Sequence, residues 1–592
     1  MTDEAQAFDP LVPRPIDRPT IVPLEGSLDG LDGAKILAAP DDPADWPLWR
    51  ERLTAWREDA RTRMAYDGAT YDLPELAWTQ SCFSCALIWL WDELLYDREA
   101  GRFTPDRLLD EGEREFGGYD GLVLWHAYPV IGIDERNQFD FYRDVPGIHA
   151  LVADIQARGV RVFVDYNPWD TGTRREGVSD GEAVAAIVRE LGADGVFLDT
   201  MKEANPELTS ALGEIALEGE STVPLARIGD HHLSWAQWFA DSAVPGVIRA
   251  RWYEQRHMLH HTRRWNRDHS DELRSAWLNG VGMLVWENVF GAWVGWNQRD
   301  RGMLRRMTAI QRRHAGLLTT GEWTPLAARS TDGSVVGSHW RRGDDELWAL
   351  ANIGSSPFAG TIDLAGREVE LSLPLPGLAA VTSAGVEVIG GGSSAYPVRP
   401  TVRREPPRVS VEAVPDGFVR APDPRSLVAR FRVREPGIYG EVPYVEEWKP
   451  LPPRLHASAE VDRPAPRGPF AIGVREVTDA SGAPLTGLTL DEARAHAAAA
   501  GARLPTEDEW QLAAEARLLE RVDPLVWNWT ESEHSDGRTR FAILKGGAAW
   551  RAEGSDWYAD GGPQDPAFSF ELLLTGPLER SPQIGFRLAV DL

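Results

Sequence analysis

The sequence predicts a multidomain chain of mixed α/β and α+β class, with a (β/α)₈ TIM barrel, a small antiparallel β domain and a C-terminal α+β domain. Three observations carry this prediction. The chain has 592 residues, 43% of them hydrophobic, which is enough for roughly three or four domains with their own cores. Short apolar runs alternate with amphipathic stretches over residues 71–320, as in βαβ units. After residue 335 the apolar period changes to two.

Residues 1–70 are expected to form an N-terminal arm and a helix. Residues 1–40 are rich in Pro, Asp and Gly and show little periodicity, which indicates an irregular arm. Residues 46–64 place apolar side chains at helical spacing, so the spacing predicts an amphipathic helix there.

Residues 71–320 are predicted to form the barrel, because buried apolar strands separated by helices indicate a parallel sheet. Helices are expected near residues 104–116, 146–158 and 180–191, and one near 301–317 closes the region. Seven strands fit a barrel better than an open sheet, and the eighth strand stays unassigned. The seven are expected at residues 81–91, 121–129, 160–168, 194–202, 214–221, 245–254 and 282–291.

The rest of the chain divides into three parts. Residues 322–395 contain short alternating runs broken by Gly and Pro, which predict a small antiparallel β domain. Residues 396–469 include two Pro-rich stretches and are expected to be a linker and the start of the C-terminal module. Residues 470–592 form a separate domain.

Composition excludes several functions. The 62 Lys and Arg residues against 91 Asp and Glu residues give a net charge of −29, so no nucleic-acid or membrane partner is expected. The two cysteines, Cys82 and Cys85, are too few for a disulfide framework or a cysteine-rich zinc site and are predicted to be buried thiols. Without a basic and apolar leader or an apolar run of 18 residues, the chain is expected to be cytoplasmic.

Four of the predicted strands end in acids. Glycoside cleavage needs two carboxyl groups, one to protonate the leaving oxygen and one to attack or to activate water. Strand ends of a rigid barrel can hold such a pair about 5 Å apart, the retaining geometry. A single acid could instead cap a helix or form an ion pair, but four in one barrel favour catalysis. The acids are Asp165, Asp199, Glu218 with Glu220, and Glu287.

At these positions the sequence resembles the α-amylase-like clan of retaining α-glycosidase barrels. The segment DYN stands where the clan has D-x-x-x-N on its third strand, FLDTMK where it has a nucleophilic Asp, and EGE where it has a Glu acid/base. The resemblance implies Asp199 as nucleophile and Glu220, or Glu218, as acid/base. The seventh strand departs from the clan, because WEN offers Glu287 in place of a His-Asp pair and leaves the transition-state stabiliser unassigned.

The expected substrate is a small α-linked oligosaccharide or glycoside. The chain has 25 Trp against 12 Tyr and 18 Phe, and such flat rings suit either sugar stacking or an aromatic core. Trp296 is a further candidate for stacking, and Arg174 and Arg175 could bind an acidic group of the substrate. The residues predicted to bind substrate are Asp165, Asn167, Trp125, His126, Trp169, Lys202, His232 and Trp286.

No metal or cofactor is expected. The segment HMLHH places His257 and His261 four residues apart, a spacing that could bridge a metal on a helix. No HExxH glutamate accompanies these histidines, so the spacing is not interpreted as a metal site.

Residues 470–592 resemble the formylglycine-generating enzyme, or sulfatase-modifying factor, family. The resemblance rests on EVTD, RLPTEDEW, VWNWTE, KGGAAW and GFR in that order, and it implies a C-type-lectin-like fold. Its copper chemistry is not implied, because both cysteines lie near position 80. Thr506 and Glu509 are predicted to form a capping box. Tight turns are predicted at Gly546, Gly547 and Gly585. The domain is expected to be an accessory module. The more specific hypothesis is that one of its loops completes the barrel's active site.

The leading hypothesis is a retaining glycoside hydrolase or transglycosylase. An α-galactosidase-like hydrolase with a sixth-strand acid such as Glu254 is the first alternative. A carbohydrate-binding protein without catalysis is the second, and an oxidase of the sulfatase-modifying type would require copper or iron. The partner is the saccharide itself, and a homo-oligomer stays open.

Overall fold

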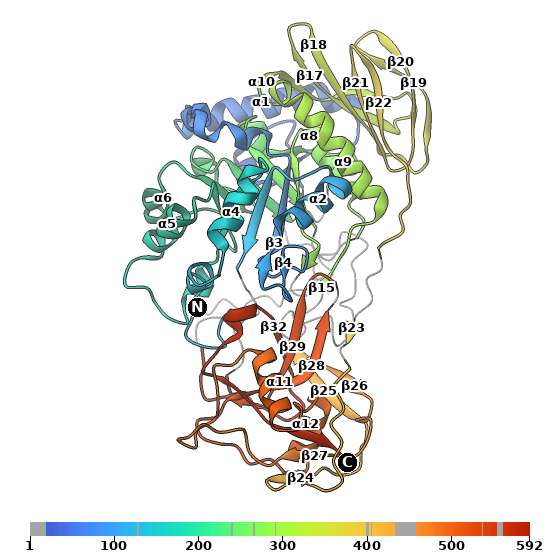
Figure 1. Cartoon of the computed structure of the whole chain (residues 1–592). Coiled ribbons are helices and arrows are strands. Elements are labelled where there is room, and N and C mark those ends of the chain that lie inside the picture. The colour runs from blue at the N-terminus through green and yellow to red at the C-terminus, as the bar shows by residue number, and fades with distance from the viewer. Residues whose placement is uncertain are drawn as a thin grey trace.

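The computed structural model shows a barrel with a β domain on one side and a C-terminal module on the other (Figure 1). No helix among the described residues is both long and apolar enough to cross a membrane. Parts of the arm and of the linker, residues 1–18 and 433–457, lie outside the described residues. The structure describes residues 19–126, 130–237, 241–263, 267–289, 292–397, 402–403, 405–432, 458–535, 537–552 and 561–592.

Eight parallel strands close into a barrel in the order β10-β12-β13-β3-β6-β7-β8-β9, which confirms the predicted fold class. The strands are buried almost throughout, because helices cover the outer face and side chains fill the interior. They are β3 (Ser84–Trp89), β6 (Gly121–Trp125), β7 (Arg161–Tyr166), β8 (Gly195–Leu198), β9 (Ala216–Glu220), β10 (Leu233–Gln237), β12 (Met258–Thr262) and β13 (Gly282–Val285).

The helices begin and end at clear signals. Helix α5 starts at a capping box formed by Ser179 and Glu182, and Gly192 ends it in the left-handed conformation. Helix α1 (Trp46–Arg63) confirms the helix predicted before the barrel. The others are α2 (Pro105–Phe116), α3 (Asp140–Arg143), α4 (Ile148–Ala157), α5 (Asp180–Leu191), α6 (Pro206–Leu212), α7 (Arg249–Tyr253), α8 (Ser270–Asn279), α9 (Gln298–Arg313) and α10 (Ala315–Thr320).

The strand predicted at 245–254 is wrong. Only β11 (Val247–Ile248) is extended there, and it pairs with β2 (Ile36–Ala38) outside the barrel before the chain turns into α7. The sixth and seventh barrel strands are β10 and β12. Neither was predicted, and β12 carries His260, a polar residue that is buried because Glu218 and the Cys82 carbonyl contact its ring nitrogens.

Smaller strands extend the barrel region. Among them, β1 joins β2 and β11 in a separate sheet, and β4 with β5 and β14 with β15 form short hairpins. They are β1 (Thr20–Ile21), β4 (Tyr96–Asp97), β5 (Arg102–Phe103), β14 (Asn288–Val289) and β15 (Ala292–Trp293).

Residues 322–390 form an antiparallel β unit in which β16-β17-β18-β21-β22 make one sheet and β19-β20 another. Its own apolar core includes Val335, Leu350 and Ile362 between the two sheets. The strands are β16 (Glu322–Arg329), β17 (Val335–Arg342), β18 (Asp345–Asn352), β19 (Phe358–Leu364), β20 (Arg367–Leu373), β21 (Gly377–Thr382) and β22 (Gly385–Gly390).

The C-terminal module is an α+β unit. Thr506 and Glu509 form the predicted capping box of α12 (Glu507–Glu515). Gly546 and Gly547 have φ of 91° and 79°, as a tight turn requires. The turn predicted at Gly585 is wrong: it lies in a strand, where a Cβ atom would come within 2.9 Å of Val526.

The remaining elements of the module are mostly antiparallel strands, and α11 packs beside them (Figure 1). Trp510, Trp527 and Trp529 are buried in the interior of the module. The elements are β23 (Val402–Arg403), β24 (Phe418–Arg420), β25 (Leu427–Arg432), β26 (Ser458–Arg463), β27 (Phe470–Gly473), α11 (Leu490–Ala499), β28 (Trp527–Ser535), β29 (Arg540–Lys545), β30 (Gly547–Ala548), β31 (Gly562–Pro563), β32 (Phe570–Leu573), β33 (Ile584–Phe586) and β34 (Ala589–Asp591).

Candidate functional site

Asp199 and Glu220 lie side by side at the carboxyl end of the barrel. The neighbouring strands β8 and β9 pair Phe197 with Glu218, and the two acids follow two residues further along each chain. Paired parallel strands are about 4.8 Å apart, so the two backbones bring the acids to the same level. The backbone N–H of Thr200 donates to Glu220 Oε2 at 2.6 Å, which ties the turn after Asp199 to the second acid.

The backbone after each acid is in the left-handed region. Thr200 has φ of 64° and Ser221 has φ of 69°, although neither residue is glycine. Ser221 donates its N–H to the carbonyl of Trp235 at 2.6 Å, which helps to hold this conformation. Such strain is concentrated at functional sites, where surrounding contacts hold the unfavourable conformation in place.

Replacing Thr200 by glycine should separate stability from activity. The left-handed conformation destabilises a residue with a Cβ atom by roughly 1–2 kcal/mol. Glycine removes this steric cost but loses more backbone entropy on folding, so Thr200→Gly should raise the free energy of unfolding by about 1 kcal/mol. The looser amide should lower kcat by roughly tenfold to a hundredfold. Thermal unfolding and steady-state kinetics measure the two effects. A variant that is less stable than the wild type would contradict the strain.

Asn167 positions Asp199. Its Nδ2 donates to Asp199 Oδ2 at 3.0 Å, which favours the ionised carboxylate. The buried Gln138 holds the Asn167 backbone on both sides: its Nε2 donates to the Asn167 carbonyl at 2.6 Å, and its Oε1 accepts the Asn167 N–H at 3.1 Å. The sequence predicted that Asn167 binds the substrate, whereas in the structure its side-chain amide donates a hydrogen bond to Asp199, the candidate nucleophile. Gln138 had no signal in the sequence beyond its place in a strand-end loop.

A second group of acids lies against His126. Its Nδ1 is 3.5 Å from Asp165 Oδ2 and its Nε2 is 3.5 Å from Asp170 Oδ2, and all three side chains are buried. Burial, and then the nearby carboxylates of Asp199, Asp170 and Glu220, raise the pKa of Asp165 well above its usual range. The raised pKa favours the protonated form of Asp165. Asp170 was not predicted, because it lies in the loop after β7 and belongs to none of the strand-end motifs.

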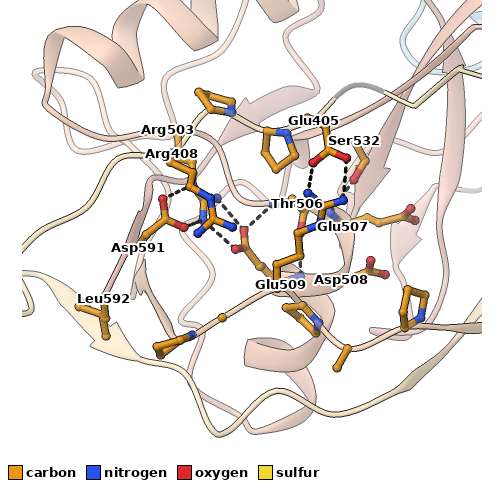
Figure 2. Close-up of a pocket in the computed structure, with 18 of the residues that line it drawn as sticks. Glu405, Arg408, Arg503, Thr506, Glu507, Asp508, Glu509, Ser532, Asp591 and Leu592 are labelled. Atoms are coloured by element: carbon orange, nitrogen blue, oxygen red, sulfur yellow. Dashed lines mark hydrogen bonds and ion pairs between the residues drawn. The ribbon is translucent and has the colours of Figure 1, made fainter.

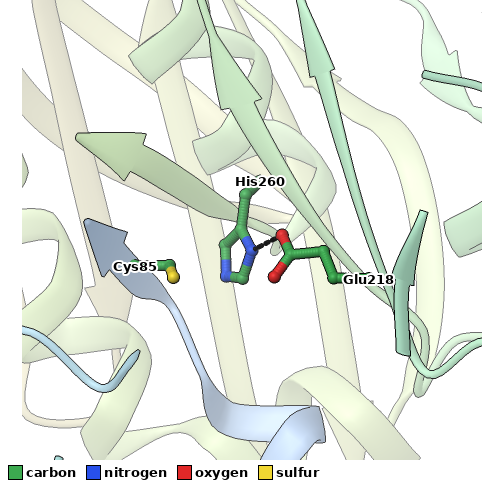
Figure 3. A group of neighbouring side chains, drawn as sticks. All are labelled: Cys85, Glu218 and His260. Atoms are coloured by element: carbon green, nitrogen blue, oxygen red, sulfur yellow. Dashed lines mark hydrogen bonds and ion pairs between the residues drawn. The ribbon is translucent and has the colours of Figure 1, made fainter. Parts of the chain in front are cut away.

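Glu218 is separated from this cluster. It lies inside the barrel with its Oε1 2.6 Å from His260 Nδ1, and His260 Nε2 lies 2.6 Å from the Cys82 carbonyl (Figure 3). Burial lowers the pKa of His260, but Glu218 and the carbonyl outweigh it and raise the pKa overall. Cys85, Glu218 and His260 are close enough to hold a metal, and both ring nitrogens of His260 already contact oxygen atoms, one of Glu218 and one of the Cys82 backbone. The three side chains form a buried ion pair beside a thiol.

The two cysteines of this region behave as predicted. Cys82 and Cys85 are free and buried. Burial raises the pKa of both thiols well above the usual range, so neither is a reactive thiolate.

Glu287 follows β13 and is engaged by arginines. Its Oε1 accepts from Arg301 at 2.5 Å and from the Trp296 N–H at 2.9 Å, while Oε2 is 3.4 Å from Arg538. Strand β13 is across the barrel from β8 and β9. These contacts make Glu287 an anchor between two segments of the chain.

His232 and Glu254 lie at the opposite end of the barrel from the acids. His232 comes just before β10 and packs on Tyr71, and burial lowers its pKa to about 4. Glu254 ends α7 and binds Arg256 at 2.8 Å and the Tyr66 hydroxyl at 2.8 Å. The predictions of His232 as a substrate ligand and of Glu254 as a sixth-strand acid are wrong, because each residue precedes a strand instead of following one.

The low pKa of His232 predicts a loss of stability in acid. The unfolded chain binds a proton near pH 6.5 and the folded chain near pH 4, so the contribution of His232 is complete above pH 6.5 and is lost as the pH falls toward 4. The slope is up to about 1.4 kcal/mol per pH unit. The His232→Leu variant should therefore lose stability less steeply between pH 6.5 and 4.5 in denaturant titrations. Parallel curves for variant and wild type would refute this assignment.

The strand-end tryptophans divide into two kinds. Trp169 follows β7 in the 3-10 helix Pro168–Thr171 and is 52% exposed. Trp125 and Trp286 are buried with ring centroids 5.8 Å apart, and the buried Trp296 stacks on His269. Trp169 is therefore the one of these four that can offer its face to a ligand.

The remaining predicted binding residues lie at the surface. Lys202 is exposed in the turn after β8. Arg174 pairs with Asp140, and Arg175 is 3.7 Å from Asp180, so both arginines have partners within the protein.

A pocket of about 270 Å³ lies in the C-terminal module (Figure 2). Arg503 pairs with Glu509 and Asp591 across it, and Arg463 is 2.9 Å from Glu507. Arg467 pairs with Glu405 at the rim of the pocket. These ion pairs join the segments of the module, and the pocket is lined by this module alone.

No protein-family model matches the sequence, and no curated protein matches it. Similar solved structures include a maltogenic α-amylase from Thermotoga neapolitana, with 10% identity over 52% of this chain and 97% of that one and a TM-score of 0.34. An isomaltulose synthase from Klebsiella sp. LX3 has 10% identity over 52% of this chain and 99% of that one, with a TM-score of 0.34. An Anoxybacillus α-amylase has 12% identity over 53% of this chain and 99% of that one, with a TM-score of 0.35. Sequence identities and TM-scores this low do not assign a reaction to this chain. The fold class rests on the closed barrel of the chain itself.

Proposed function

We propose that the protein is a retaining glycoside hydrolase or transglycosylase that acts on a small α-linked saccharide. The observation that carries the proposal is the pairing of Asp199 with Glu220 at the ends of β8 and β9. The ends of barrel strands are where enzymes of this fold place their catalytic groups.

The two acids take different roles because their surroundings differ. Asp199 accepts a hydrogen bond from Asn167 and attacks the anomeric carbon as the glycosidic C–O bond breaks. Glu220 gives its proton to the leaving oxygen, and the Thr200 N–H, which donates to Glu220 Oε2, holds this carboxyl group beside Asp199. In the second step Glu220 takes a proton from water or a sugar hydroxyl, and the resulting nucleophile displaces Asp199 with overall retention.

Neighbouring groups support binding. The exposed indole of Trp169 lies two residues after Asn167 and can stack on a sugar ring. Asp165, which carries a raised pKa, can donate a hydrogen bond to a sugar hydroxyl. The α-linkage rests on the resemblance of the DYN, FLDTMK and EGE segments to α-glycosidase barrels.

A panel of aryl α- and β-glycosides and small saccharides tests the function. We expect turnover of an α-glycoside, with proton NMR showing the α-anomer as the first product. Inversion of the anomer would contradict the roles of both acids. A thermal shift with sugars but no turnover would support the carbohydrate-binding alternative instead.

A further inference from the structure

The β28–β29 hairpin of the C-terminal module reaches the carboxyl end of the barrel (Figure 1). Glu93 donates its N–H to the Arg538 carbonyl at 2.7 Å and accepts from the Ser535 hydroxyl at 2.7 Å. Asn288 donates through Nδ2 to Thr539 Oγ1 at 3.1 Å. Ser535, Arg538 and Thr539, here called the hairpin tip, therefore contact the segments that follow β3 and β13.

Arg538 anchors the hairpin tip. Its Nε lies 2.9 and 3.1 Å from the two oxygens of Asp92, and its Nη1 lies 3.4 Å from Glu287. The Arg538 side chain is 4% exposed and that of Asp92 is fully buried. Arg301 supplies a second positive charge to Glu287 and also pairs with Glu115. A network of charge-assisted hydrogen bonds of this kind holds its members in one arrangement.

The hairpin tip faces the acids across the barrel. In the closed sheet, β13 and β3 are separated from β8 and β9 by two strands on either side. Phe541, next to the tip, packs on Trp89 with centroids 6.1 Å apart, and Trp89 packs on Trp125 at 5.2 Å. These buried rings fill the barrel end beneath the tip, so one half of the end carries Asp199 and Glu220 and the other half is covered.

A second set of contacts fixes the module beside the barrel. Arg98 pairs with Glu579 and with Asp491. Arg136 donates to the Leu578 carbonyl at 2.7 Å. The hairpin tip thus has a fixed position, because the module is held at two separate places.

Resting on the function proposed above, we propose that the hairpin tip is a wall of the saccharide site that restricts cleavage to short saccharides and chain ends. A long chain cleaved in its interior must extend to both sides of the two acids. An extension toward β3 and β13 would meet the hairpin tip and the packed rings of Trp89 and Phe541. The C-terminal module then acts as a specificity device, and Arg538 is a positioning residue that holds the wall.

The first test uses the wild-type protein. The substrates are a series of two to seven sugar units with the linkage that the enzyme cleaves, labelled at the reducing end. We expect kcat/KM to fall by about tenfold or more along the series, and products released from one end. Cleavage at internal bonds, or a rate that rises with chain length, would overturn the proposal. Absence of turnover on every saccharide would refute the proposed function itself, which is a separate outcome.

The second test uses Arg538→Ala with Arg98→Ala as the matched control, since each removes one arginine from the contact between module and barrel. We expect Arg538→Ala to flatten the chain-length profile to within about threefold, while Arg98→Ala keeps the wild-type profile. Asp92→Asn with Arg538→Gln removes the charges with little change in volume and serves if the alanine variant does not fold. A folded variant of either kind with the wild-type profile would contradict the wall.

Discussion

Asp199→Asn should abolish turnover and leave the fold intact. The amide cannot form the glycosyl ester, so kcat should fall by about 10⁴-fold or more, as when nucleophiles are removed from other enzymes. The side chain keeps its size and can still bond to Asn167 Nδ2 through its carbonyl oxygen, so thermal unfolding should change little. Steady-state kinetics on the best aryl glycoside and a melting curve measure the two quantities.

The matched control for this variant is Asp154→Asn on the exposed face of α4. It makes the same chemical change on an exposed helix face that no strand end contributes to, and its kcat should equal that of the wild type. If Asp199→Asn kept more than a tenth of the wild-type rate, the assignment of the nucleophile would be wrong.

Glu220→Ala should slow substrates according to their leaving groups. A sugar leaving group needs a proton, so its rate should fall by about 10³-fold, whereas an activated aryl glycoside should lose little in the first step. Azide should then restore turnover and yield a glycosyl azide, because it attacks the intermediate without a general base. Rates with and without azide on the two substrate types provide the measurement.

Glu218→Gln is the comparison for Glu220→Ala, since the predictions from sequence named both glutamates. Glu218 pairs with His260 inside the barrel, so its loss should lower the melting temperature and give no azide rescue. Rescue of Glu218→Gln and not of Glu220→Ala would exchange the two roles.

The barrel was predictable because strands buried on both faces leave long apolar runs in the sequence. The run at 245–254 shows the limit of this signal. It is as apolar as a strand, yet only Val247 and Ile248 are extended, since helix α7 follows. Conversely, β12 is polar in sequence, and its His260 is buried only because Glu218 and the Cys82 carbonyl lie across the barrel interior.

The acids at strand ends were predictable in type and less so in position. Asp199 follows β8 and Glu220 ends β9, as expected, but Glu218, two residues before Glu220, is fully buried in the barrel. His232 was placed at the wrong end because β10 had not been assigned. Once that strand is known, a residue just before it belongs to the amino end.

The contacts of Arg538 and Gln138 could not be predicted, because they depend on pairings between distant segments. Arg538 is separated from Asp92 by 446 residues, and nothing local to either residue indicates the other. Gln138 acts on the Asn167 backbone, whose place follows from the barrel closure. The resemblance of residues 470–592 to the sulfatase-modifying factor family stays a prediction for the fold of the module.

Covalent trapping tests directly whether Asp199 is the nucleophile. A fluorinated α-glycosyl fluoride of the sugar that the enzyme turns over forms the intermediate faster than it is hydrolysed, so the glycosyl ester accumulates. Mass spectrometry of the intact protein and of its peptides then locates the added sugar. We expect one sugar per chain, attached to Asp199 and absent from the Asp199→Asn variant. Attachment to another carboxylate, such as Asp165 or Glu287, would contradict it.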